Sequence, residues 1–340
     1  MAEPTEVKTR EVLPGFHLVY LPLPMRPTIV NVYLVNGGSE WALIDTGMST
    51  PDSMDAFRAA LEAVGCLPQA IKKIICTHHH PDHFGTSRAY RELCHAEVFL
   101  HPLEAAQVSG FLPQPRTPEM NRFLTRNGIP SELFVNLPSR GEFWKGMYEP
   151  AAPDHAIADR MKIAVGEREL EAVWTPGHSP GHCVMYFRKE KAAIVGDHLL
   201  PKITPHVGIT TDNGGDPLGD FLSSLRKVGE LDVETVLPAH GAVYADHRKR
   251  VAQLIEFHEY RLEVMLDVVR ARPRTAYDVA LEAFDLTRQS PLQQLFPATF
   301  ETLAHLEHMR LQGRTERIDR DDAVLWRARS SNRRSAHETS

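Results

Sequence analysis

The residues of this sequence best suited to chemistry are histidines and aspartates in a clustered order. The segment HHHPDH at positions 78–83 directly follows the apolar run Ile71 to Cys76 and contains the spacing H-x-H-x-D-H. Imidazole and carboxylate groups are preferred ligands of zinc and similar divalent cations. Four such groups within six residues therefore predict a metal site. The candidate ligands in this segment are His78, His80, Asp82 and His83.

Three further segments each place a potential ligand where an apolar run ends. The run EAVW leads through Thr-Pro-Gly into His178, AAIVG leads into Asp197, and ETVLPA leads into His240. Ligand sites collect at strand ends in an α/β sheet, because the sheet fixes position while the loops supply chemistry. We therefore expect these three side chains to converge with the histidine segment.

The order of these motifs resembles the metallo-β-lactamase superfamily over roughly residues 15–245. The segment LIDTG at 43–47 is also similar to an early strand and turn of that family. Within the superfamily, TPGHSPGH at 175–182 and GDH at 196–198 are similar to the glyoxalase II-like hydrolases. Among these groups, the chain most resembles the β-lactamase-like proteins that carry a C-terminal winged-helix-like module.

The resemblance implies an α/β fold, a four-layer αβ/βα sandwich, with two metal ions. The ligands of the first metal would be His78, His80 and His178. The ligands of the second would be Asp82, His83 and His240. Asp197 would bridge both metals, whereas Asp45 matches a structural position and not a ligand.

Two zinc ions are the expected cofactor, with iron or manganese as alternatives that a bridging carboxylate tolerates. Two cations lower the pKa of a shared water to about 7, so that a metal-bridged hydroxide can attack a carbonyl or phosphoryl centre. We assign catalytic roles to Asp82, which can orient the nucleophile, and to the bridging Asp197. The sequence contains no catalytic cysteine motif, and we expect the metal-bound water to be the nucleophile.

Several residues beside the candidate ligands have simpler interpretations. We expect a structural role for His79, which lies between two ligands and points the other way along an extended loop. We expect His182 and His198 to hydrogen-bond to ligands rather than to bind metal. Phe84 is expected in the core. For His206 the sequence leaves open whether it reaches substrate or packs within its loop.

Alternating strands and helices predict a catalytic domain over residues 1–247. Strands are expected within residues 16–45 and over 71–76, with a helix over Ser53 to Val64 between them. Strands return between residues 161 and 197, and a helix over Leu218 to Val228 with a following strand completes the unit.

Residues 102–165 interrupt this alternation with eight prolines. We predict helices near Glu119 to Arg126 and over Ser131 to Leu137, and we interpret the segment as a lid-like insertion. Its large apolar residues either wall the substrate site or form a small separate hydrophobic cluster, and the sequence leaves both open. These residues are Phe111, Phe123, Phe134, Phe143, Trp144, Met147 and Tyr148.

Residues 248–330 predict a C-terminal helical, winged-helix-like domain: three helices, then a two-stranded wing with Asp321-Asp322 near its turn. Residues 251–340 contain 13 Arg, no Lys and 14 acidic residues, a net charge of −1, whereas a DNA-binding module needs a basic surplus. We therefore expect a packing module or a homodimer contact. We expect a disordered tail over residues 331–340.

The composition of the whole chain sets the remaining expectations. The 340 residues carry a formal net charge of −6 and are 42% hydrophobic, which is typical of a globular protein and disfavours nucleic acid as a partner. Four widely spaced cysteines predict no disulfide framework. The first residues contain no secretory signal, and no apolar run approaches the ~20 residues of a membrane span. We expect a cytoplasmic protein without a membrane partner.

The predicted function is hydrolysis of an ester-like carbonyl in a small-molecule substrate: a thioester, an ester or a lactone. One alternative is a phosphodiesterase that cleaves single-stranded RNA, which would need a basic groove. A second is a mononuclear iron enzyme similar to persulfide dioxygenases. A third is a non-catalytic protein that senses a metabolite. We would expect such a protein to have lost some of the metal ligands.

Overall fold

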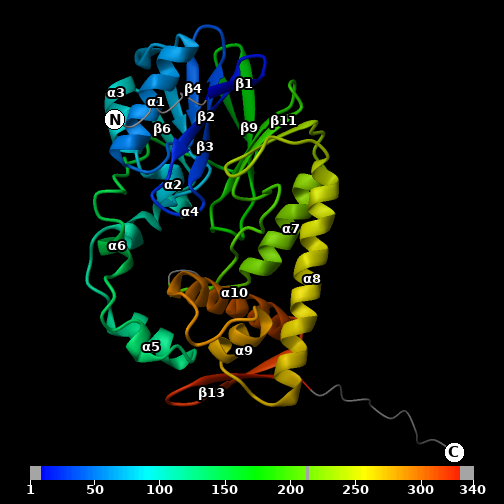
Figure 1. Ribbon diagram of the computed structural model, residues 1–340. Helices are drawn as coiled ribbons and strands as arrows, with labels where there is room; N and C mark the ends of the chain where they lie inside the picture. The colour runs from blue at the N-terminus through cyan, green and yellow to red at the C-terminus, as the bar shows by residue number, and fades with distance from the viewer. Residues whose placement is uncertain (1–8, 212–213, 330–340) are drawn as a thin grey trace, which may run out of the picture. The chain divides into compact units, whose positions relative to one another are not determined.

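The computed structural model describes residues 9–211 and 214–329 (Figure 1). The predicted tail over residues 331–340 lies outside the described residues. Two compact units divide the chain. The first comprises residues 1–116, 138–207 and 219–255, and the second comprises residues 117–137, 208–218 and 256–340. The domain boundary predicted at residues 247/248 stays a prediction.

The first unit contains two β-sheets. The larger has the strand order β1-β2-β3-β4-β5-β6-β7, and the smaller has the order β12-β11-β10-β9-β8. The larger sheet consists of β1 (Thr9–Leu13), β2 (Phe16–Pro22), β3 (Ile29–Asn36), β4 (Trp41–Ile44), β5 (Ile71–Ile75), β6 (Glu97–Leu100) and β7 (His155–Ala156). The smaller consists of β8 (Met161–Val165), β9 (Arg168–Trp174), β10 (Cys183–Phe187), β11 (Ala192–Gly196) and β12 (Thr235–Pro238).

The two sheets face each other across a shared hydrophobic core. Tyr33 and Ile44 from the larger sheet pack with Met185 and Ile194 from the smaller one, and all four are almost fully buried. Burial of such apolar surface is the main driving force for joining the sheets. The predicted α/β sandwich is therefore confirmed.

Helices cover the outer faces of the sheets. The outward side chains of β2 to β6 form a second core with α1 (Pro51–Val64) and α3 (Ser87–Cys94), where Phe57 and Tyr90 stack at 4.1 Å between ring centroids. Helix α1 begins two residues before its predicted start, because Thr50 accepts a hydrogen bond from the Ser53 backbone N–H as an N-cap. Helix α7 (Pro217–Gly229) matches the helix predicted over residues 218–228.

The helices of the insertion are all short, and its last residues contribute β7 and β8 to the two sheets. The helical segments are α4 (Pro102–Ala105), the 3₁₀ turn η2 (Val108–Phe111), α5 (Pro118–Arg126), the 3₁₀ turn η3 (Ser131–Leu133) and α6 (Arg140–Phe143). The helix predicted over Ser131 to Leu137 is therefore wrong beyond Leu133. Pro138 disfavours helical backbone at the preceding residue, and too few residues remain after Pro130 to repay helix nucleation.

The second unit contains α5, α9 (Ala276–Ala283), α10 (Leu292–Leu311) and an antiparallel hairpin of β13 (Thr315–Asp319) and β14 (Val324–Ala328). The boundary between the units falls within α8 (His247–Ala271). The predicted wing is confirmed, with Asp321-Asp322 in its turn. In residues 9–211 and 214–329, no helix has the length and apolar character of a membrane span.

Candidate metal centre

All seven candidate ligands lie in the first unit, in segments that follow strands, with Asp82 and His83 in the one-turn helix α2 (Pro81–Phe84). The histidine segment follows β5, His178 follows β9, Asp197 follows β11 and His240 follows β12. Strands β11 and β12 are parallel, and β9 and β11 are both antiparallel to β10. The carboxyl ends of β9, β11 and β12 therefore meet at one edge of the smaller sheet.

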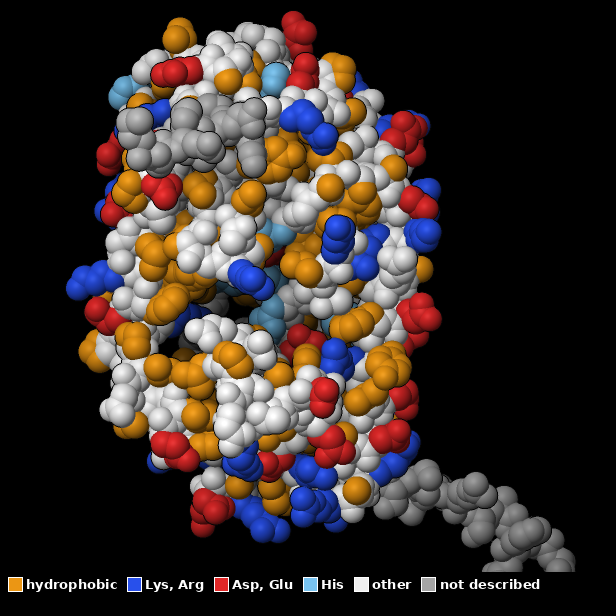
Figure 2. All heavy atoms as spheres, viewed as in Figure 1, with side chains coloured by type: hydrophobic (Ala, Val, Ile, Leu, Met, Phe, Trp, Pro, Cys, Tyr) orange, Lys and Arg blue, Asp and Glu red, His pale blue; other side chains and the backbone are white. Residues whose placement is uncertain are grey.

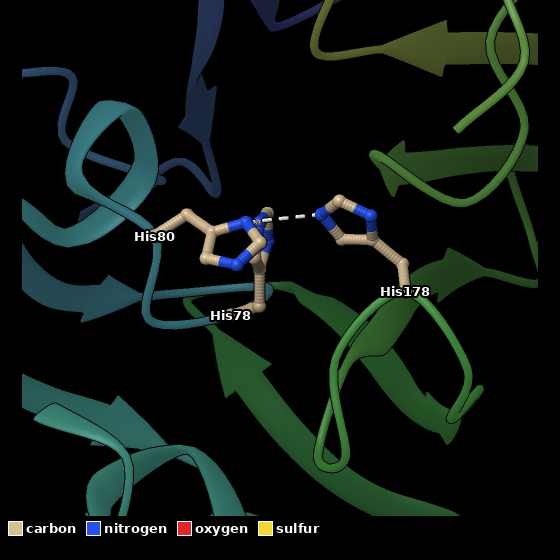
Figure 3. A group of neighbouring side chains, drawn as sticks. All are labelled: His78, His80 and His178. Atoms are coloured by element: carbon tan, nitrogen blue, oxygen red, sulfur yellow. Dashed lines mark hydrogen bonds between the residues drawn. The ribbon is translucent and has the colours of Figure 1, made fainter. Parts of the chain in front are cut away.

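Three histidine side chains from two of these loops face one another (Figure 3). The Nδ1 atom of His80 lies 3.0 Å from Nε2 of His78 and 3.0 Å from Nε2 of His178. A tetrahedral cation with Zn–N bonds of about 2.1 Å keeps its ligand atoms roughly 3.4 Å apart. This spacing therefore fits three nitrogen ligands of one divalent cation.

A second group of side chains lies beside this triad. The Nε2 atom of His240 is 3.2 Å from an Asp82 carboxylate oxygen and 3.4 Å from an Asp197 oxygen. The Nε2 atom of His83 is 3.6 Å from oxygens of both aspartates. The Asp197 carboxylate also lies 3.6 Å from Nε2 of His178, so it faces both groups. Potential ligand atoms lie within 4.8 Å of one another in each of three sets: His78, His80 and His178; His78, His83 and Asp197; and Asp82, His83 and His240.

Hydrogen bonds at the outer nitrogens aim the imidazoles inward. The Nδ1–H of His83 donates to Asp45, which also accepts bonds from the Thr77 backbone N–H and hydroxyl. The Nδ1–H groups of His178 and His240 donate to the backbone carbonyls of His206 and Ile29, at 2.8 and 3.0 Å. Because each Nδ1 is occupied, each Nε2 is left as the atom that can bind a cation.

Burial and mutual proximity keep the triad neutral. Burial lowers the pKa of His78 and His80 well below the usual value, and the neighbouring imidazoles lower it further. A neutral imidazole is the form that binds metal. In the second group, burial opposes the charge of His83, but the carboxylates of Asp82, Asp197 and Asp45 outweigh it and raise the His83 pKa.

The structure itself supplies a test of whether a cation fits. Buried polar atoms normally have hydrogen-bond partners. Nε2 of His83 and Oδ1 of Asp197 are both buried and have none among the described residues. Mixed imidazole and carboxylate donors at these spacings match what zinc, iron or manganese requires. The residues present therefore fit a divalent metal centre.

Glu104 connects two of the loops that carry candidate ligands. Its buried carboxylate accepts hydrogen bonds from the His79 backbone N–H at 2.9 Å, from the His79 ring and from the Gly181 backbone N–H. His79 lies between two ligands and Gly181 lies three residues after His178. Sequence reasoning missed Glu104, because a lone acid in a short helix of a proline-rich insertion carries no recognisable signal.

Neither His182 nor His198 belongs to a ligand group, as expected. The hydrogen bonds expected from them to ligands are not found among the described residues: Nδ1 of His182 bonds instead to the Thr175 hydroxyl at 2.9 Å, and both ring nitrogens of His198 are buried without such a bond. Phe84 is fully buried in the core between β-strands and helices. His206 supports His178 through its backbone carbonyl.

Two aromatic residues of the insertion lie beside the triad and are nearly buried. The ring centroid of Phe111 lies 5.8 Å from that of His80, and Tyr148 donates a hydrogen bond to the His79 carbonyl. The guanidinium of Arg140 stacks on Phe111 at 4.2 Å. In contrast, Phe123 and Phe134 pack in a separate core of the second unit. Part of the insertion therefore forms a separate hydrophobic cluster. That other parts wall the substrate site or act as a lid stays a prediction.

Comparison with known proteins agrees with this geometry. Residues 25–240 match the model of the metallo-beta-lactamase superfamily, and residues 262–330 match the metallo-beta-lactamase-like C-terminal domain. The chain is 25% identical to a probable metallo-hydrolase, YqjP, of Bacillus subtilis, over 90% of this chain and 92% of that protein.

Two further similarities extend this comparison. A crystal structure of a metallo-beta-lactamase family protein from Thermus thermophilus superposes with a TM-score of 0.82 and 33% identity, covering 94% of this chain and 100% of that one. An atrochrysone carboxyl ACP thioesterase of Aspergillus fumigatus is 25% identical over 68% of this chain and 56% of that protein. The chain is therefore a member of the metallo-beta-lactamase superfamily and carries a metallo-beta-lactamase-like C-terminal domain.

Proposed function

We propose that this protein is a metal-dependent hydrolase that holds two divalent cations and cleaves an ester-like carbonyl compound, with thioesters first among the candidates. The observation that carries the proposal is the convergence of seven buried or half-buried donor groups on one space, with Asp197 facing both groups. We propose the ligands named from the sequence, with zinc as the metal.

The chain's own residues would divide the work. Two cations held by these groups would lower the pKa of a water molecule and polarise the substrate carbonyl. Asp82 and Asp197 stay ionised, because His83 and His240 lower the pKa of both carboxylates against the effect of burial. An ionised Asp82 can accept a hydrogen bond from the attacking water and orient it. Water adds to the carbonyl carbon, the carbon–sulfur or carbon–oxygen bond breaks, and a carboxylic acid and a thiol or alcohol leave.

Two observations favour an acyl substrate over a phosphodiester. The nearly buried side chains of Phe111 and Tyr148 make the surroundings of the triad apolar, which suits an acyl or aromatic group. Acidic and basic side chains are scattered among apolar and uncharged ones over the face shown in Figure 2, and the described residues of that face form no continuous basic band for a phosphate backbone. The thioesterase relative supports the same substrate class.

The test combines metal analysis with a substrate panel. We expect two equivalents of zinc by mass spectrometry, turnover of acyl thioesters or esters, and no cleavage of single-stranded RNA or bis-p-nitrophenyl phosphate. His80→Ala should lose at least one metal and reduce turnover by about a thousandfold or more. His95→Asn, at an exposed histidine, should keep both.

Three results would contradict the proposal. Full turnover by His80→Ala would refute the metal-dependent mechanism. Cleavage of RNA without acyl hydrolysis would favour the phosphodiesterase. A single iron with oxygen consumption on a persulfide substrate would favour the dioxygenase.

A further inference from the structure

Asn31 is a buried amide within the apolar strand β3, and it is not one of the candidate ligands. Its side chain is 2% exposed, and its neighbours along the strand, Val30 and Val32, are fully buried. Asparagine is disfavoured in strands, and burial of an amide is costly unless the amide is hydrogen-bonded. The interactions of this side chain therefore have to compensate for its position.

The amide of Asn31 holds the backbone on both sides of His240. Its Nδ2 atom lies 2.9 Å from the carbonyl oxygen of Pro238 and 2.8 Å from that of Gly241. Both partners are acceptors, so only the amide nitrogen, with its two N–H groups, can face them. We call residues 238–241 the His240 turn. One side chain thus fixes this turn before and after the candidate ligand.

The backbone of β3 adds two hydrogen bonds to the same turn. Strand β4 pairs with β3 only from Tyr33 onward, so the first residues of β3 have an edge that β4 does not cover. On this edge the Asn31 backbone N–H donates to the Ala239 carbonyl at 2.7 Å. The Ile29 carbonyl accepts from the Nδ1–H of His240 at 3.0 Å. The His240 turn therefore docks on the open edge of a strand of the larger sheet.

Two further hydrogen bonds hold the turn without the Asn31 side chain. The Tyr33 hydroxyl donates to the Pro238 carbonyl at 2.8 Å. On the other side, the Ala239 backbone N–H donates to the Gly196 carbonyl at 3.1 Å. Because these bonds remain when the amide is removed, we expect the fold to survive such a change while the backbone of the turn gains freedom to shift.

The contact reaches only the second group of candidate ligands. Nε2 of His240 lies 3.2 Å from an oxygen of Asp82, so a shift of the turn would change this spacing directly. In the part of the chain that the structure describes, the Asn31 amide bonds to no segment that carries a ligand of the triad. The triad consists of His78, His80 and His178.

We propose that Asn31 is a positioning residue for the second metal. Its amide fixes the His240 turn so that Nε2 of His240 faces Asp82 and Asp197, and it thereby determines the affinity for the second cation but not for the first. Groups that orient metal ligands set metal affinity even though they do not touch the cation. This inference rests on the two-metal centre proposed above.

The experiment is a competition titration with a zinc chelator, which gives the affinity of each of the two zinc ions, together with the zinc content by mass spectrometry. We expect the second zinc to bind about 10–100-fold more weakly in Asn31→Ala, while the first stays within about threefold of wild type. Asn36→Ala is the matched control. It lies at the end of the same strand, where its side chain accepts from the Gly38 backbone N–H, and it should bind both zinc ions like wild type.

A merely structural role would give a different pattern. Metal-free Asn31→Ala would then melt at a lower temperature than metal-free wild type, while both zinc affinities stayed unchanged. Equal weakening of both zinc ions would also refute the proposal, because it predicts a selective loss. Asn31→Ser keeps a small polar side chain that cannot reach both carbonyls. It should show the same selective loss and carries the test if Asn31→Ala does not fold.

A crystal structure of the zinc-loaded wild type supplies a test that needs no variant. Nδ2 of Asn31 should stay within about 3.2 Å of both carbonyl oxygens while His240 binds zinc. An amide that has left these carbonyls would overturn the proposal. Wild type that binds fewer than two zinc ions would refute the proposed metal centre and this inference with it. Two zinc ions in wild type with unchanged affinities in Asn31→Ala would refute this inference alone.

Discussion

Glu104 shows how one buried carboxylate can set the positions of several candidate metal ligands. It holds the His79 backbone and ring on one loop and the Gly181 backbone on another. The His79 imidazole and the backbone donors lower the pKa of Glu104 in spite of its burial, so the carboxylate is ionised and accepts charge-assisted bonds. Glu104 is therefore a positioning residue for His78, His80 and His178, which flank its contacts.

Glu104→Gln should weaken metal binding without unfolding the protein. The amide keeps the size of the side chain but loses the negative charge that holds the two loops together. Changes to groups that orient metal ligands typically lower metal affinity about 10–100-fold. Competition titration with a zinc chelator measures this affinity directly. Glu97→Gln, at a surface acid of β6, serves as the matched control.

A purely packing role for Glu104 would give a different result. In that case the metal-free variant would melt at a lower temperature than metal-free wild type, while its zinc affinity stayed within about twofold. Equal zinc affinities of Glu104→Gln and wild type would exclude the positioning role.

At the scale of elements, Gly177 determines how the loop after β9 passes α7. Its φ is +135°, and a Cβ atom there would lie 2.4 Å from Cβ and 2.5 Å from Cα of Phe221. Neither the backbone angle nor the space admits a side chain. Gly177→Ala should therefore lower the free energy of unfolding by about 2 kcal/mol or more and weaken zinc binding through displacement of His178.

Gly65→Ala separates the two causes. Gly65 ends α1 with φ of +66°, and nothing lies within 4 Å of the Cβ that alanine would add. In Gly65→Ala only the left-handed backbone conformation is unfavourable, so the free energy of unfolding should fall by about 1 kcal/mol. The variant should bind zinc like wild type. Denaturant unfolding with zinc titration distinguishes the pair, and identical losses in both variants would contradict the steric argument.

Glu301 of α10 should make the stability of the protein fall as pH rises. Burial raises its pKa to about 7, above the ordinary 4.5, although Arg261 opposes this. The protonated form is favoured in the folded state, so its stabilisation is complete below about pH 4.5 and is lost as pH rises through about 7. Glu301→Gln should remove this loss. The free energy of unfolding of the variant minus that of wild type should therefore be about 2–3 kcal/mol larger at pH 8 than at pH 5.

The comparison between the two proteins isolates Glu301 from its histidine neighbours. His258 and His305, 3.1 Å apart, have pKa values lowered by burial, and they favour the folded state as pH rises. Their contribution is present in both proteins and cancels in the difference. Urea unfolding at pH 5 and pH 8 gives the four free energies, and a difference independent of pH would refute the assignment.

The elements that could be predicted from the sequence are those with local signals. Helix α1 has an N-cap, apolar periodicity and a terminal glycine, and its prediction was correct to within two residues at its start. Strand β1 was not predicted, because its five residues are half-exposed and it pairs only with β2. The helix predicted after Ser131 was wrong because the neighbouring prolines, and not the composition of the segment itself, determine its backbone conformation.

At the scale of the whole molecule, the candidate site was predictable because its residues are marked by type and spacing. All seven candidate ligands converge, although they come from four separate stretches of chain. Residues that orient the candidate ligands through tertiary contacts could not be predicted from the sequence. Glu104 and the carbonyl of Ile29 carry no motif, and their roles depend on which loops the two sheets bring together.

The metal centre also links the chemistry of the first unit to its stability. Without metal, the charges of Asp82 and Asp197 are balanced in part by His83 and His240, whose pKa values these carboxylates raise. The unloaded site therefore has its own compensating ion pairs, and we expect the metal-free protein to fold. A cation that binds only the folded state adds stability according to its free concentration relative to the dissociation constant.

Removal of the metal should therefore lower the melting temperature without preventing folding. At free zinc 100 times above the dissociation constant the gain is about 2.7 kcal/mol, which corresponds to roughly 5–10 °C for a unit of this size. Scanning calorimetry before and after chelation, followed by zinc addition, measures the shift and its reversal. His80→Ala should show a much smaller shift, because its first triad is incomplete. An equal shift in wild type and His80→Ala would place the stabilising metal elsewhere, and no shift in wild type would mean that the converging side chains do not bind zinc in solution.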